Sequence, residues 1–141
     1  MAATVRYEDV EIGTELPTQD FPVQRVDLVR YCGASGDANV IHWNQRVAQA
    51  VGLPDVIAHG MFTMAQAARV VTDWVGDPGA VLSYGVRFSR PVVVPDEGGT
   101  TLTVSGVVED KLDDRCVRVV LTAKCGPDKV LAGAKVVVRL A

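Results

Sequence analysis

The pattern of apolar positions predicts one long helix at the centre of the chain. From Gly60 to Val75 apolar residues recur at helical spacing, and the Gly76–Gly79 segment then supplies residues that end a helix. The positions expected to face the core are Met61, Met64, Ala65, Ala68, Val71 and Val75. Small residues among them, together with Ala67, would let other segments pack closely against this helix.

Beyond this helix, apolar and polar residues alternate as they do in strands. Alternating apolar positions are Leu82, Tyr84, Val86 and Phe88, then Leu102, Val104 and Val108, and then Val117, Val119, Leu121 and Ala123. A last strand is expected over Val130 to Leu140. An antiparallel sheet with one apolar face must bury that face, so the pattern predicts an α+β fold in which the sheet packs on the helix.

The first third of the chain is less regular. Leu16 to Val23 reads as a short strand weakened by two prolines, and Val26 to Cys32 as a short helix. Asn44 is a candidate N-cap for a further helix that runs through Val51 and stops at Gly52. A length of 141 residues predicts a single domain over residues 1–141 with a sizeable core.

Composition excludes several classes of function. A net charge of −3 and a pI near 5.3 argue against broad nucleic-acid binding, which needs a concentrated positive field. The N-terminus lacks the apolar core of a signal peptide, and no apolar run is long enough to cross a bilayer. Three cysteines without C-x-x-C spacing suggest neither a disulfide scaffold nor a zinc site. We therefore expect a cytoplasmic protein with neither nucleic-acid nor membrane partners.

The segment from Tyr31 to His42 concentrates the residues that can do chemistry. On one continuous helix, Asp37 and His42 would lie about 140° apart and could not meet. In a loop, which Gly36 and Asn39 favour, the carboxylate and the imidazole would face each other across a bend. Such a pair is suited to acid–base catalysis. The spacing alone leaves open a purely structural turn, in which Asp37 caps a loop amide and His42 is half buried.

A second candidate feature lies where the long helix begins. The free N–H groups of a helix N-terminus stabilise a developing oxyanion, and Gly60 has no side chain to keep a carbonyl away. His59 is expected to hold the loop before Gly60 through a hydrogen bond, with a ligand or proton-relay role as the alternative. Asn39 is expected to fix the loop around Asp37. A metal site made by Asp37, His42 and His59 is conceivable, but nothing else in the sequence calls for a metal.

Other side chains have a structural and a functional interpretation. Trp43, Met61, Phe62 and Met64 could line a tunnel for an apolar ligand, although such a set usually belongs to the core. Arg87 and Arg90 could form a basic rim for a phosphorylated ligand or an acidic protein. The charges of Arg118, Lys124, Lys135 and Arg139 are expected on a solvated sheet face.

The residues of this segment also resemble a known family. Tyr31 to His42 is similar to the signature Y-x-x-x-S-G-D-x-N-P-x-H of the MaoC-like (R)-specific enoyl-thioester hydratases and dehydratases. Residues 36–43, 57–61, 74–80 and 86–88 most resemble the B subunits of actinobacterial (3R)-hydroxyacyl-carrier-protein dehydratases of fatty-acid synthesis. One departure is Val40 in place of the usual proline. It removes a fixed φ, while its β-branch favours an extended backbone.

The resemblance implies a hotdog fold, with the sheet wrapped around the long helix, and a reversible hydro-lyase reaction without cofactor or metal. It implies that Asp37 and His42 are catalytic and that Gly60 supplies the oxyanion hole. The substrate would be an acyl-ACP or acyl-CoA thioester, and the protein a dimer with itself or with a related hotdog subunit. A non-catalytic partner subunit and a hotdog thioesterase are the alternatives.

Overall fold

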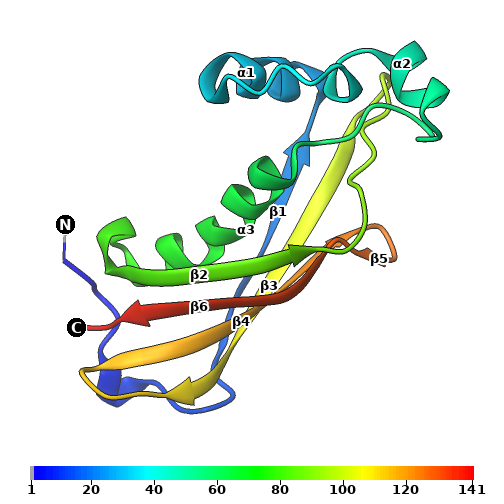
Figure 1. Ribbon diagram of the computed structural model, residues 1–141. Coiled ribbons are helices and arrows are strands. Elements are labelled where there is room, and N and C mark those ends of the chain that lie inside the picture. The colour runs from blue at the N-terminus through cyan, green and yellow to red at the C-terminus, as the bar shows by residue number, and fades with distance from the viewer. Residues whose placement is uncertain (1) are drawn as a thin grey trace.

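The computed structural model describes residues 2–141, which form a curved antiparallel sheet packed around one long helix (Figure 1). The strands are β1 (Glu15–Val23), β2 (Val81–Phe88), β3 (Thr100–Lys111), β4 (Cys116–Cys125), β5 (Asp128–Lys129) and β6 (Leu131–Arg139). They are ordered β1-β3-β4-β6-β2, and β5 pairs with β4. The helices are α1 (Arg25–Ser35), α2 (Gln45–Ala50) and α3 (Gly60–Val75), with 3₁₀ turns η1 (Tyr7–Asp9), η2 (Val40–His42) and η3 (Pro78–Ala80). The predicted α+β arrangement is confirmed.

Helix α3 has the predicted bounds but not the predicted buried face. It ends at Gly76, whose φ of 79° lies in the left-handed region that glycine adopts without strain. Its buried residues are Phe62, Thr63, Ala67, Val70, Val71 and Val75. Met61, by contrast, is 57% exposed, so the predicted stripe was wrong over the first turns of the helix. Apolar residues occur on more than one face of α3, so helical spacing alone does not select the buried one.

The central strands show the predicted alternation. The inward-facing residues of β3 and β4 that the pattern singled out are buried, and those of β6 join the same core. Strand β2 is an edge strand and departs from the prediction, because Leu82 and Phe88 are 50% and 54% exposed. In the middle of β2, the Tyr84 hydroxyl donates to the Met64 carbonyl of α3 at 3.0 Å.

The two prolines of β1 are accommodated because β1 is the other edge of the sheet. Its register with β3 shifts between Leu16 and Gln19, next to Pro17. A proline has no N–H to donate, and an edge strand needs no partner on its outer side. The strand is therefore longer and more regular than its prolines suggest.

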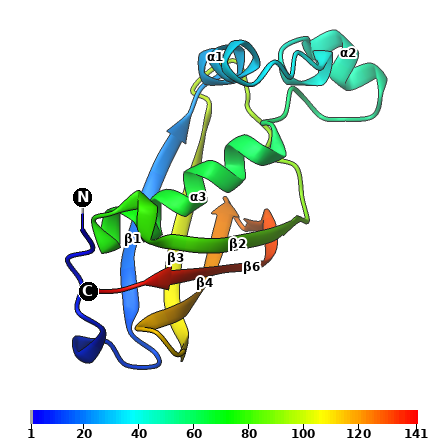
Figure 2. The same ribbon diagram turned by 60° about the vertical axis from the view of Figure 1, so that its left-hand side comes forward.

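Helices α1 and α2 form a separate layer beyond one end of the sheet (Figures 1 and 2). Helix α1 is longer than predicted, because it starts in a capping box between Gln24 and Asp27 and continues to Ser35. Helix α2 starts as predicted, where the Asn44 side chain accepts the Val47 N–H at 3.1 Å. The path between them, residues 36–44, carries most of the candidate site residues.

Arg25 connects this layer to the rest of the molecule. Its guanidinium lies 2.6 Å from the Asp55 carboxylate and donates to the Val94 carbonyl at 3.0 Å. It also reaches the Gln45 side chain on α2. One side chain therefore joins α1, α2 and the two segments that run beneath them.

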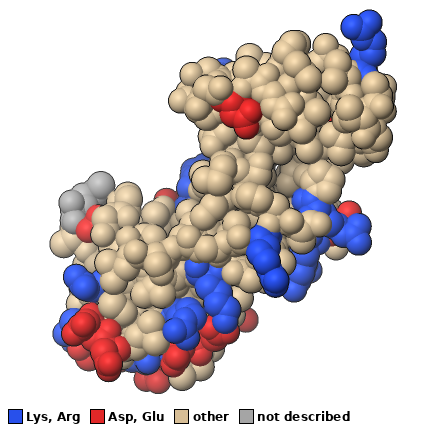
Figure 3. Space-filling view, in the orientation of Figure 1, with Lys and Arg blue, Asp and Glu red and all other residues tan. Residues whose placement is uncertain are grey.

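On the face of the molecule that Figure 3 shows, charged side chains gather mainly over the sheet. The space-filling view shows a largely uncharged upper part and mixed basic and acidic groups below it (Figure 3). Lys135 binds Glu109 at 2.9 Å, and Arg118 binds Asp110 at 3.2 Å. These contacts, and the exposure of Lys124 and Arg139, confirm the predicted solvated sheet face. None of the helices described within residues 2–141 is long and apolar enough to span a bilayer.

Candidate active site

Asp37 is held at the point where α1 ends. Gly36 adopts a φ of 76° and terminates the helix, so the chain turns before it reaches Asp37. The Ser35 hydroxyl donates to the Tyr31 carbonyl at 2.7 Å and accepts the Asp37 N–H at 3.1 Å. One oxygen of the Asp37 carboxylate accepts the Asn39 N–H at 3.2 Å. These contacts fix the backbone of Asp37 and leave its carboxylate exposed.

The loop is shorter than the sequence suggested. Helix α1, which was expected to end at Cys32, continues to Ser35, and Val40 to His42 form the 3₁₀ turn η2. The break at Gly36 is nevertheless enough to take Asp37 and His42 off a common helix axis. Asn39 accepts the Ile41 N–H through its side chain at 3.3 Å and so caps η2. Val40 starts this helical turn, which corrects the expectation of an extended backbone there.

His42 is buried, and its ring is oriented by a backbone carbonyl. Its Nδ1 lies 2.7 Å from the Ile57 oxygen. Because a carbonyl can only accept, Nδ1 carries the proton, and Nε2 of the neutral ring is left as a base. Burial lowers the pKa of His42, as His59 does to a smaller extent, while the Ile57 carbonyl and the Asp37 carboxylate raise it; the net shift is downward from 6.5. His42 is therefore neutral at neutral pH.

The Ile57 carbonyl is itself held in place by backbone pairing. Ile57 forms a β-bridge with Val93, and the flanking bonds Ala58 N–H to Val92 O and Val94 N–H to Val56 O measure 2.8 and 2.9 Å. The acceptor that sets the tautomer of His42 thus belongs to a short paired segment rather than to a free loop.

His59 lies directly against His42 and also contacts the Asp37 backbone. The two imidazole rings are stacked, with centroids 3.7 Å apart. Nε2 of His59 donates to the Asp37 carbonyl at 3.0 Å and lies 3.6 Å from the Cys32 sulfur. Its Nδ1 is buried, and no hydrogen-bond partner for it is found within residues 2–141. The predicted hydrogen bond from His59 to the loop is present, and it reaches the Asp37 residue itself.

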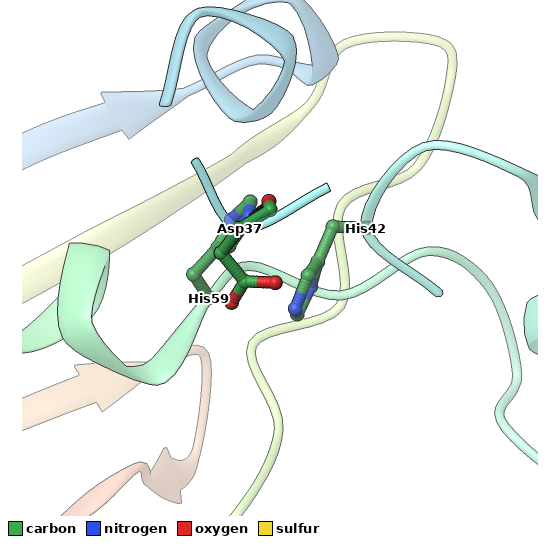
Figure 4. A group of neighbouring side chains, drawn as sticks. All are labelled: Asp37, His42 and His59. Carbon is green, nitrogen blue, oxygen red and sulfur yellow. Dashed lines mark hydrogen bonds between the residues drawn. The ribbon is translucent and has the colours of Figure 1, made fainter. Parts of the chain in front are cut away.

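The structure therefore brings Asp37, His42 and His59 together from three separate segments (Figure 4). One polar atom of each side chain lies within 4.8 Å of the others, and the Asp37 carboxylate is turned towards the His42 ring. The same set could hold a divalent cation. Two of the four imidazole nitrogens, however, already donate to backbone carbonyls.

Gly60 lies in the same pocket as His42. It is the first residue of α3, and the first hydrogen bond between backbone groups of this helix runs from the Thr63 N–H to the His59 carbonyl at 3.1 Å. The N–H of Gly60 precedes that bond and has no acceptor within the helix. Gly60 lines a cavity of about 270 Å³ together with His42, Thr63 and Phe88. Asp37 lies outside this lining, beside the cavity on the His42 side.

Sequence reasoning missed or misplaced several side chains near the pocket. The alternation of β2 assigned Phe88 to the core, yet its ring lines the cavity. Trp43 and Met61 are 49% and 57% exposed, so the core interpretation was wrong for both, whereas Phe62 is buried as predicted. The Arg90 side chain, predicted to lie on a basic rim, does line the pocket. No local pattern indicated the role of Arg25, because its partners are far away in the sequence.

Comparison with known proteins gives a consistent result. Over 70 residues, which is half of this chain, it is 43% identical to 3-hydroxyacyl-thioester dehydratase X of Mycobacterium tuberculosis and spans 24% of that protein. It is 29% identical to the (R)-specific enoyl-CoA hydratase of Rhodospirillum rubrum, over 74% of this chain and 73% of the relative. A solved MaoC-like dehydratase superposes on 99% of the chain with a TM-score of 0.96 and 42% identity, and the chain covers 43% of it.

The structural match confirms the predicted hotdog fold. The chain spans about a quarter of the first of these relatives and less than half of the solved dehydratase. The sequence profile of the MaoC like domain matches residues 8–124, which is most of the chain. This protein therefore belongs to the MaoC-like dehydratase family.

Proposed function

We propose that this chain catalyses the reversible, (R)-specific dehydration of 3-hydroxyacyl thioesters to trans-2-enoyl thioesters. The observation that carries the proposal is that the Asp37 carboxylate and a ring nitrogen of His42 lie within 4.8 Å of each other, while Gly60 lines the same pocket as His42. The names of the two relatives describe this reaction in its two directions. Fatty-acid elongation is the pathway in which we expect it to act.

Dehydration requires a base at C2, an acid at C3 and a stabilised thioester oxygen. In the proposed mechanism, Nε2 of His42 takes the C2 proton while the Gly60 N–H donates to the oxygen that becomes an enolate. The protonated Asp37 carboxyl gives its proton to the departing C3 hydroxyl, which leaves as water. Return of the proton from His42 to Asp37, by way of solvent, restores the starting state. Hydration follows the same steps in reverse.

The lowered pKa of His42 supports one of the two possible assignments of base and acid. Burial lowers this pKa and keeps the imidazole neutral, which favours the form that accepts a proton. An ionised Asp37 with a protonated His42 would instead require a charged ring in a buried position. We therefore assign His42 as the base in dehydration and Asp37 as the acid.

His59 and Asn39 are proposed to position the two catalytic side chains. His59 contacts both of them, through its stack on the His42 ring and its hydrogen bond to the Asp37 carbonyl. Asn39 binds the carboxylate of Asp37 through its N–H and caps the turn that carries His42 through its side chain. Neither residue needs to touch the substrate in this scheme.

The substrate is proposed to be an acyl-ACP or acyl-CoA thioester, and the working unit a dimer. Both edges of the sheet, β1 and β2, have one side without a paired strand within residues 2–141. Strand β2 also exposes Leu82 and Phe88, and an edge of this kind is a ready surface for pairing with a second sheet. The partner would be a second copy of this chain or a related hotdog subunit.

The test is to follow the absorption band of the enoyl thioester while the purified protein acts on crotonyl-CoA, with a thiol-reactive dye to detect hydrolysis. We expect the band to disappear without thiol release and the product to be the (R)-3-hydroxy thioester. Asp37→Asn is expected to lower kcat by about 10²–10⁴-fold, the usual contribution of a positioned acid or base, with an unchanged circular dichroism spectrum.

Three outcomes would contradict this proposal. Thiol release would indicate a thioesterase. An Asp37→Asn variant with full activity would remove the assigned acid. A protein that leaves both crotonyl-CoA and a longer enoyl-ACP unchanged, alone and after addition of a related hotdog subunit, would indicate a non-catalytic partner.

A further inference from the structure

The ring of Phe88 covers the backbone of Gly60. A Cβ atom built on Gly60 would lie 3.0 Å from each of Cε1, Cε2 and Cζ of Phe88. Equal distances to three neighbouring ring atoms put that point over the face of the ring rather than at its edge. Gly60 and the phenyl face are therefore in direct contact, and the absence of a side chain at Gly60 is what permits it.

The position of Phe88 is not explained by the core of the subunit. It is the last residue of β2 and pairs with Leu131 of β6, yet 54% of it remains exposed. The buried part of its ring lies against Gly60, in a cavity that His42 also lines. An aromatic side chain that is half exposed and partly turned into a pocket is better placed to contact a ligand than to stabilise the sheet.

The contact with Gly60 determines which part of a substrate the ring would meet. In the proposed function the thioester oxygen accepts the Gly60 N–H, so the carbonyl carbon lies within a few ångströms of the glycine. The two atoms bonded to that carbon are the sulfur and C2. His42, which would be directed at the proton on C2, and Phe88 line the same cavity, so the proposed function places C2 within reach of the phenyl face.

We propose that Phe88 is a specificity-determining residue that excludes substituents at C2 and so selects unbranched thioesters. The proposal rests on the proposed function, because the position of C2 follows from it. A single methyl group refused by an apolar wall changes kcat/KM by roughly 10–200-fold.

The test compares kcat/KM for crotonyl-CoA and for its 2-methyl analogue, tigloyl-CoA. We expect Phe88→Ala to raise the ratio of branched to unbranched kcat/KM by about tenfold or more, mainly through tigloyl-CoA. Phe88→Tyr, which keeps the ring face, and Val51→Ala, which removes an exposed apolar side chain outside β2 and outside the pocket lining, should leave the ratio unchanged. Phe88→Val is a second small variant, for use if the alanine variant does not fold.

Two results would overturn the proposal. One is a ratio of branched to unbranched kcat/KM that stays within twofold of the wild-type value in both Phe88→Ala and Phe88→Val. The other is an equal loss of kcat/KM for tigloyl-CoA and crotonyl-CoA, which would indicate a structural role. Calorimetry with the saturated thioesters butyryl-CoA and 2-methylbutyryl-CoA separates this proposal from the reaction itself. If the wild type transforms no enoyl thioester, the proposed function fails, and the ratio of the two dissociation constants in Phe88→Ala then decides the role of Phe88.

Discussion

The imidazole rings of His42 and His59 are stacked, with centroids 3.7 Å apart and planes inclined by 24°. His59 also donates to the backbone carbonyl of Asp37, so one buried ring touches both members of the proposed acid–base pair. The stack restricts the His42 ring from one side, while the Ile57 carbonyl orients it through Nδ1. The geometry of the pair therefore depends on a residue that has no assigned step in the chemistry.

Replacement of His59 by phenylalanine should reveal this positioning role. The variant keeps an aromatic ring against His42 but loses the hydrogen bond to the Asp37 carbonyl. We expect kcat to fall by about tenfold, which corresponds to the net free energy of one hydrogen bond. His59 also lowers the pKa of His42, so the acid limb of the pH–rate profile should move to higher pH. A lower kcat with an unmoved acid limb would contradict the electrostatic part of this prediction.

The pH dependence of the wild type follows from the burial of His42. Its pKa is lowered from 6.5, so the neutral base persists to a lower pH than it would in a free histidine. As pH falls through this lowered pKa, the imidazole takes up a proton and can no longer accept the one on C2. We expect the acid limb of kcat/KM for dehydration to be centred below pH 6.5. An acid limb centred above that value would show that His42 is not the base.

Arg25 is expected to stabilise the layer that carries the site. Arg25→Met leaves the Asp55 carboxylate, which is 19% exposed, without its 2.6 Å partner. Because the pair is largely but not fully buried, we expect the free energy of unfolding to fall by about 1–3 kcal/mol, below the range for fully buried pairs. Urea denaturation measures this change.

The matched control for Arg25 is Lys135→Met. Lys135 forms a 2.9 Å pair with Glu109, but the two side chains are 51% and 39% exposed. An exposed pair of this kind contributes at most about 1 kcal/mol. Equal losses in the two variants would show that the contacts of Arg25 with Val94 and Gln45 add nothing to its ion pair.

Gly60 and Phe88 should behave as a coupled pair. The methyl group of Gly60→Ala would meet the Phe88 ring at 3.0 Å, so the ring or the start of α3 must move, and we expect a large loss of kcat/KM. In the double variant with Phe88→Ala the obstruction is absent, and part of the activity should return. A double variant whose loss equals the product of the two single losses would show that the two positions act independently.

Much of the fold follows from local patterns in the sequence. Gly60 and Gly76 bound α3 where the sequence indicates, because helix ends depend on residues within a turn of them. The buried residues of β3 and β4 match the alternation, since successive side chains of a strand point to opposite faces. Gly36 likewise marks the end of α1 and separates Asp37 from the helix axis.

The tertiary structure decided how segments that are distant in the sequence lie relative to one another. The sequence placed Asp37, His42, His59 and Gly60 among the candidates, but the stack of the two imidazoles and the Ile57 acceptor depend on three segments meeting in space. Periodicity reports only the geometry within one element. Phe88 therefore had the pattern of a core residue and lies instead against Gly60, because it ends an edge strand beside the first residue of α3.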